Sequence, residues 1–239
     1  MKAISWIKIP MGKRWLWLFV FGMAMGLLEA AVVVYLRQLY YPHGFDFPMT
    51  SIPVHILGVE LCREIATIVM LLSLAWIAGY TAVQRLAWFL YSFAIWDLSY
   101  YLFLYVFLGW PSSLFTWDLL FLLPIAWTSP VLAPVLVSLT FILLAWGMLV
   151  VESADTRPLP LLSWLLLACG AVVLIFSFLY DYASFMFQYI RWSDFWNSAK
   201  TDMVMYYSAQ YIPRSYNWFL FVIGEVMLLG SLFVYRLRR

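Results

Sequence analysis

Three ionisable side chains lie within one helical turn of a strongly apolar stretch, residues 55–80. They are Glu60, Arg63 and Glu64. Each costs roughly 2.5–3.5 kcal/mol near the middle of a bilayer, so other polar groups must face them. An arginine beside two carboxylates leaves one excess negative charge, which a proton or another cation would neutralise. The pattern predicts either an ionic clamp that fixes helix packing or a site that binds cations or protons.

Other apolar stretches carry buried ionisable residues as well. Glu29 lies on the helical face of Gly22 and Gly26, a small-residue pattern that favours close helix packing within the chain or between two copies. Asp97 has Tyr101 one turn later, where a phenol can hydrogen-bond to the carboxylate or relay a proton. With a carboxylate in the last span, they complete the predicted polar cluster: Glu29, Glu60, Arg63, Glu64, Asp97, Tyr101 and Glu225.

The composition indicates an integral membrane protein. Of its 239 residues, 66% are hydrophobic, 21% aromatic and only 11% charged, whereas soluble proteins are about a quarter charged. No hydrophilic stretch is long enough for a soluble domain, so we expect a single membrane domain over residues 1–239. No basic stripe suggests nucleic acid, and the two cysteines, both in apolar stretches, indicate neither a disulfide framework nor a metal cluster.

The apolar stretches predict an all-α fold, a polytopic transmembrane helical bundle of about six spans. The predicted spans are residues 15–36, 55–80, 86–108, 131–151, 161–180 and 217–235. The fourth and fifth spans contain no charged residue before their far ends. We therefore expect these two to be ordinary lipid-facing or scaffold helices.

Two of the connectors are unusual. The seven apolar residues 117–123 are too few to cross a bilayer, and three prolines follow them within eleven residues. The segment near 116–130 is therefore predicted to be an interfacial or re-entrant helix with Thr116 as its N-cap, or a kinked start of the next span. Such a segment must be covered by protein or line a cavity. Residues 181–216 are too aromatic for a solvated linker, so we expect them in the headgroup layer or folded over the bundle.

The distribution of basic residues predicts the orientation. With six spans, nine lysines and arginines fall on one side and four on the other, which favours both termini in the cytoplasm of a bacterial inner membrane. Most buried acids then lie in the outer half, where they can face one cavity under the connectors 37–54, 110–130 and 181–216. Residues expected at its rim are Arg37, His43, His55, Asp118 and Asp181.

Three functions fit these features. The first is a non-catalytic subunit or scaffold of a membrane complex, held to a protein partner or a second copy through Gly22 and Gly26 or the aromatic connectors. The second is a small transporter or a proton- or cation-binding protein. The third is an intramembrane enzyme acting on a lipid-linked substrate, with carboxylates as acid and base or as metal ligands with a histidine.

The sequence specifies no cofactor. His43 and His55 lie in a loop and at a helix end, which does not suit a haem held between two spans. The common catalytic motifs of metalloproteases, serine hydrolases and P-loop enzymes are absent from the sequence. The bilayer itself is the partner that the composition predicts.

Overall fold

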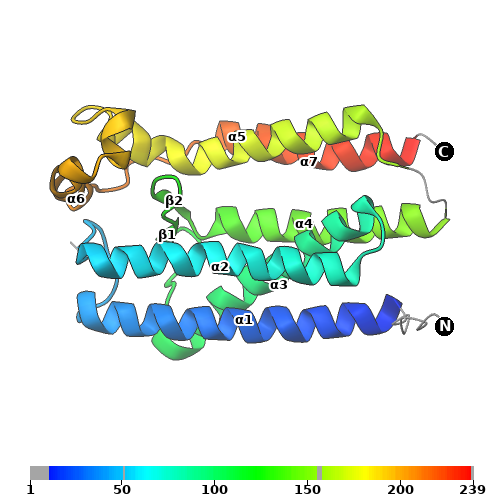
Figure 1. The fold of residues 1–239 in the computed structure, drawn as a ribbon, viewed down its shortest axis with the longest axis horizontal. Coiled ribbons are helices and arrows are strands. Elements are labelled where there is room, and N and C mark those ends of the chain that lie inside the picture. The colour runs from blue at the N-terminus through cyan, green and yellow to red at the C-terminus, as the bar shows by residue number, and fades with distance from the viewer. Residues whose placement is uncertain (1–10, 51, 155–157, 238–239) are drawn as a thin grey trace, which may run out of the picture.

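The computed structural model describes residues 11–50, 52–154 and 158–237. Within these ranges, six helices are long and apolar enough to cross a membrane. They are α1 (Met11–Tyr40), α2 (Val54–Ala78), α3 (Ala82–Leu108), α4 (Leu132–Ala154), α5 (Leu161–Met186) and α7 (Trp218–Leu237). The predicted all-α membrane bundle is confirmed. Helix α1 begins and α7 ends at the same end of the bundle (Figure 1).

Helices α3 and α4 form the centre of the bundle. Helix α3 packs against α1, α2 and α4, while α7 packs against both α4 and α5. In the most apolar 18-residue stretch of each helix, about half of the residues are buried in α3 (50%) and α4 (56%), against 22–33% in the other four candidate spans. Of the two roles expected for the fourth span, α4 therefore fits a scaffold helix better than a lipid-facing one, because it packs against both α3 and α7.

The contact between α1 and α3 depends on small residues. A Cβ atom added at Gly26 would lie 2.1 Å from Ser99 Oγ and 2.8 Å from the carbonyl oxygen of Trp96. One at Gly22 would lie 2.8 Å from a methyl carbon of Ile95. The glycine face predicted from the sequence is therefore occupied by a helix of the same chain.

Residues 117–130 form a β-hairpin rather than the expected helix. Strand β1 (Trp117–Phe121) pairs with β2 (Trp127–Pro130) in antiparallel register, with Asp118 opposite Ser129. The pairing satisfies backbone groups that a proline-rich helix would leave free, because each strand bonds to the other. Thr116 caps no helix; its hydroxyl instead accepts a hydrogen bond from the backbone N–H of Ser113. The hairpin contacts α4 and α5 through β2.

The aromatic connector after α5 lies at the same end of the bundle as the hairpin (Figure 1). It contains two short 3-10 helices, η1 (Trp192–Trp196) and η2 (Ser198–Lys200), and the helix α6 (Thr201–Ser208). The Lys200 ammonium donates to Asp194 at 2.7 Å, and this bond, with one from the backbone N–H of Arg191, lowers the pKa of Asp194. Tyr182 of α5 and Ser208 of α6 share a hydrogen bond of 2.6 Å, so the connector is folded over the bundle.

Candidate functional site

Arg63 joins the carboxylates of two helices. Its Nη1 lies 3.1 Å from Oε1 of Glu29 on α1, and its Nε donates to Oε1 of Glu60 on α2 at 2.9 Å. Helix α3 takes part as well, because the indole N–H of Trp96 donates to Oε2 of Glu29 at 2.7 Å. These contacts join α1, α2 and α3 through one charged cluster, to which each helix contributes at least one hydrogen-bonding side chain.

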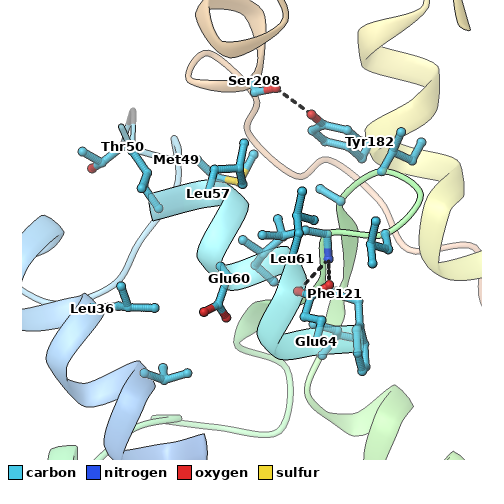
Figure 2. Close-up of a pocket in the computed structure, with 18 of the residues that line it drawn as sticks. Leu36, Met49, Thr50, Leu57, Glu60, Leu61, Glu64, Phe121, Tyr182 and Ser208 are labelled. Atoms are coloured by element: carbon cyan, nitrogen blue, oxygen red, sulfur yellow. Dashed lines mark hydrogen bonds between the residues drawn. The ribbon is translucent and has the colours of Figure 1, made fainter. Parts of the chain in front are cut away.

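Glu64, one turn after Glu60, holds the hairpin to α2. The backbone N–H of Leu122 donates to both carboxylate oxygens of Glu64, at 3.0 and 3.1 Å. Figure 2 shows this contact, with the Glu60 carboxylate on the preceding turn directed away from it. The carboxylate therefore satisfies a backbone group just beyond β1, and sequence reasoning missed this role because the acceptor and donor lie on separate elements.

Arg37, near the end of α1, pairs with Asp118 of β1. Its Nη2 lies 3.3 Å from Asp118 Oδ1, and Tyr101 donates to the other carboxylate oxygen at 3.2 Å. The guanidinium packs against two aromatic rings that are nearly perpendicular to each other, 3.7 Å from the ring centre of Trp110 and 4.6 Å from that of Phe45. Burial raises the pKa of Asp118 to about 6, although Arg37 opposes that shift.

A first cavity of about 290 Å³, which we call cavity 1, joins these groups. Among the described residues, its charged lining consists of four carboxylates and two guanidinium groups: Glu29, Glu60, Glu64, Asp118, Arg37 and Arg63. The remaining wall is largely apolar and comes from the predicted connectors as well as the helices. Figure 2 shows Leu36, Met49 and Leu57 around it, with the bonded pair Tyr182 and Ser208 on the side of α5 and α6.

A second cavity of about 230 Å³, cavity 2, adjoins the first. The two have Glu29, Tyr100, Leu120 and Phe121 in common. Its wall is mostly apolar and strongly aromatic, with contributions from Phe89, Phe93, Trp96, Phe121, Trp127, Phe141 and Phe178. Asp97 belongs to this second cavity and accepts a hydrogen bond from Ser138 of α4 at 2.8 Å.

The structure separates some of the candidate residues. Tyr101 was predicted to bond to Asp97, but its phenol donates to Asp118 instead, because the hairpin brings that carboxylate nearer. Glu225 lines neither cavity and accepts from Thr140 of α4 at 2.5 Å. Asp181 likewise lines neither, and it accepts from Tyr211 at 2.7 Å and from two backbone N–H groups.

The two histidines, His43 and His55, are exposed and line neither cavity. In the described part of the chain, no group of three or more His, Cys, Asp or Glu side chains is arranged to hold a metal ion.

Several partners of the buried charges were not predicted. Ser138 and Thr140 are hydroxyl residues in an otherwise apolar helix, a signal that marks α4 as facing the polar interior. The rings of Phe45 and Trp110, from two different connectors, both pack against Arg37, and sequence spacing carries no signal for that arrangement.

Comparison of the chain with models of protein families, with curated proteins and with solved structures gives no match. The class of protein therefore follows from the fold alone. The chain is an integral, multi-pass membrane protein, because six apolar helices of the described residues are each long enough to cross a bilayer.

Proposed function

We propose that this protein binds an amphiphile that carries a positive charge. The observation that carries the proposal is the contact between a charged cavity and an aromatic, apolar one, which have Glu29, Tyr100, Leu120 and Phe121 as a common wall. Binding sites of small molecules are mostly apolar, with a few polar groups that fix the orientation of the ligand. The charged end of the ligand would lie in cavity 1 and its apolar end in cavity 2.

The charge of cavity 1 favours a cation. When ionised, its four carboxylates exceed its two guanidinium groups by two negative charges, counted over the described lining residues. Arg63 already pairs with Glu29 and Glu60, and Arg37 already pairs with Asp118. A protonated amine would offset part of the excess, because an opposite charge nearby stabilises a carboxylate in a medium of low dielectric constant.

The place of cavity 1 in the fold suggests where the ligand comes from. Its lining includes connector residues at the end of the bundle opposite the start of α1 and the end of α7 (Figure 1). We infer from the excess of basic residues on the other side that both termini lie in the cytoplasm of a bacterial inner membrane. Cavity 1 would then take its ligand from the outer leaflet of that membrane.

A second function, that of a non-catalytic subunit or scaffold, is favoured by one observation. Arg63 has its Nε and both of its terminal nitrogens engaged by Glu29 and Glu60, as in an ionic clamp that holds α1 against α2. In this function the charged cluster would fix helix packing, and a protein partner would bind elsewhere. A stoichiometric partner that copurifies in mild detergent, together with no ligand binding, would favour the scaffold over the amphiphile-binding protein.

Binding of dodecylamine and of dodecanol to the purified protein in lipid nanodiscs tests the proposal. We expect the amine to raise the unfolding temperature more than the alcohol does, because only the amine is charged. Glu60→Gln should weaken amine binding about tenfold, since it removes one charge-assisted contact.

Glu225→Gln is the matched control, because Glu225 is another acid of an apolar helix but lines neither cavity. Equal stabilisation by the amine and the alcohol, or equal loss of amine binding in the two variants, would contradict the proposal.

A further inference from the structure

Arg37 has a hydrogen-bond donor with no acceptor. Its Nη1 is buried and finds no partner among the described residues, while the side chain as a whole is 9% exposed. Four other described residues have a buried side-chain atom without a partner: Trp88, Ser92, Glu152 and Glu225. Of the five, Arg37 alone contributes to the wall of cavity 1 or cavity 2.

The surroundings of Arg37 hold its guanidinium in one place. Nη2 is engaged by Asp118, and the guanidinium packs against the rings of Trp110 and Phe45, which are nearly perpendicular to each other. A guanidinium held by an ion pair at one nitrogen and packed against two rings has little freedom to turn towards another acceptor within the protein. Because a buried charged donor without an acceptor is strongly unfavourable, the free N–H group indicates an acceptor that comes from outside the chain.

We propose that Nη1 of Arg37 binds a phosphate oxygen of the ligand, so that cavity 1 takes a polar group carrying both a phosphate and an amine. This inference rests on the proposed function, which places the amine of the ligand in cavity 1. Arginine favours phosphate because its N–H groups form charge-assisted hydrogen bonds with the oxygens. Phosphoethanolamine, the headgroup of a common class of membrane lipid, has this combination of charges.

The positions of the charges in the fold agree with such a group. Arg37 lies in the last turn of α1, and Glu60 and Glu64 lie in the first half of α2, on the other side of the connector 41–53. All three contribute to the wall of cavity 1. A zwitterionic group spanning the cavity would therefore meet a cationic donor at one end and carboxylate acceptors at the other, while an attached chain would extend towards cavity 2.

The experiment compares three probes in nanodiscs: dodecylamine, a lysophosphatidylethanolamine and inorganic phosphate. We expect the wild-type protein to bind the lysolipid more tightly than dodecylamine. The variant R37M/D118N removes the whole ion pair, which avoids leaving a single buried charge. It should lose about tenfold in affinity for the lysolipid and keep its affinity for dodecylamine.

Two further variants guard against a misfolded protein. Arg37→Lys keeps the charge beside Asp118 but lacks the second terminal nitrogen, so it should lose the preference for the lysolipid while unfolding at nearly the wild-type temperature. Arg85→Met removes an arginine that also stacks on an aromatic ring, that of Trp76, away from both cavities. This control should leave both affinities unchanged.

The outcomes separate this inference from the proposed function. Dodecylamine that binds as tightly as the lysolipid, with a ratio unaffected by the Arg37 variants, would overturn the phosphate subsite and leave the amine site standing. Inorganic phosphate that competes with the lysolipid in the wild type but not in R37M/D118N would support the subsite for a soluble phosphate. Competition by phosphate-bearing lipid alone would support it for a lipid headgroup. Failure of every probe to bind would overturn both proposals.

Discussion

The backbone N–H of Leu122 lies 3.0 and 3.1 Å from the two carboxylate oxygens of Glu64, so a side chain of α2 supports the β-hairpin. Both residues also line cavity 1. The hairpin in turn presents Asp118 to Arg37, and it contributes Leu120 and Phe121 to both cavities. The position of one buried carboxylate therefore bears on the shape of the whole site.

Glu64→Ala should loosen the hairpin. Loss of the acceptor leaves the Leu122 N–H without its partner, which costs about 1–3 kcal/mol and should accelerate hydrogen exchange in peptides that contain Leu122. Glu64→Gln keeps a carbonyl acceptor and should have a smaller effect. Cys62→Ala changes an exposed position of the same helix and serves as the control. Unchanged exchange at Leu122 in Glu64→Ala would show that the bond does not hold the hairpin.

The pair of Glu29 and Arg63 should show strong energetic coupling. Arg63→Met leaves two carboxylates without their cation and should cost about 3–5 kcal/mol of stability, as breaking a buried ion pair does. Glu29→Gln should cost less, because its amide oxygen can still accept from Trp96. The double variant should be more stable than the sum of the single losses predicts, as measured by unfolding in detergent. Strictly additive losses would mean that the two side chains do not interact.

The sequence predicted the membrane helices well because length and apolarity alone determine which segments can cross a bilayer. All six predicted spans overlap a long helix of the described chain. The glycine face of α1 packs within the chain, which is one of the two arrangements expected for it. Which helix lies at the centre depends on contacts between helices. The apolar composition of α4 therefore left open whether it faces lipid or supports the bundle, although Ser138 and Thr140 carried a polar signal.

Within the site, the cost of burying a charge identified the residues but could not pair them. The structure brings together Glu29, Glu60, Arg63 and Glu64. Tyr101, however, bonds to Asp118 and not to Asp97, the residue one turn before it. The hairpin was missed because residues 117–123 look like a short apolar helix when read alone. Strand pairing across a proline-containing turn is a contact between separate segments, which local periodicity does not report.

The close contact of α1 with α3 predicts the effect of a single methyl group. Gly26→Ala places a Cβ atom against Ser99 Oγ and the backbone of α3, so the helices must separate, at a cost of about 1–3 kcal/mol. Gly58→Ala is the matched control in α2, since no atom lies within 4 Å of its added Cβ atom. That change should be neutral or slightly stabilising, because alanine is the better helix former. Equal unfolding temperatures for the two variants would argue against the packing of α1 on α3.

The stability of the protein should depend on pH through Asp118. Its pKa is raised by burial from about 3.8 to about 6 in the folded state, so folding favours the protonated carboxyl. The stability that this preference contributes is complete below about pH 3.8 and is lost as the pH rises through about 6. The full change amounts to about 3 kcal/mol, because one pKa unit corresponds to about 1.4 kcal/mol.

Asp118→Asn cannot ionise and therefore provides the reference. The unfolding temperature of the wild type minus that of Asp118→Asn should fall between about pH 4 and about pH 7, because only the wild type acquires a buried charge. Had the attraction of Arg37 outweighed burial, the pKa would be lowered and the same difference would rise with pH. The sign of the slope thus decides whether burial or the attraction of Arg37 dominates at this ion pair. A difference that rises with pH would contradict a pKa of Asp118 raised by burial.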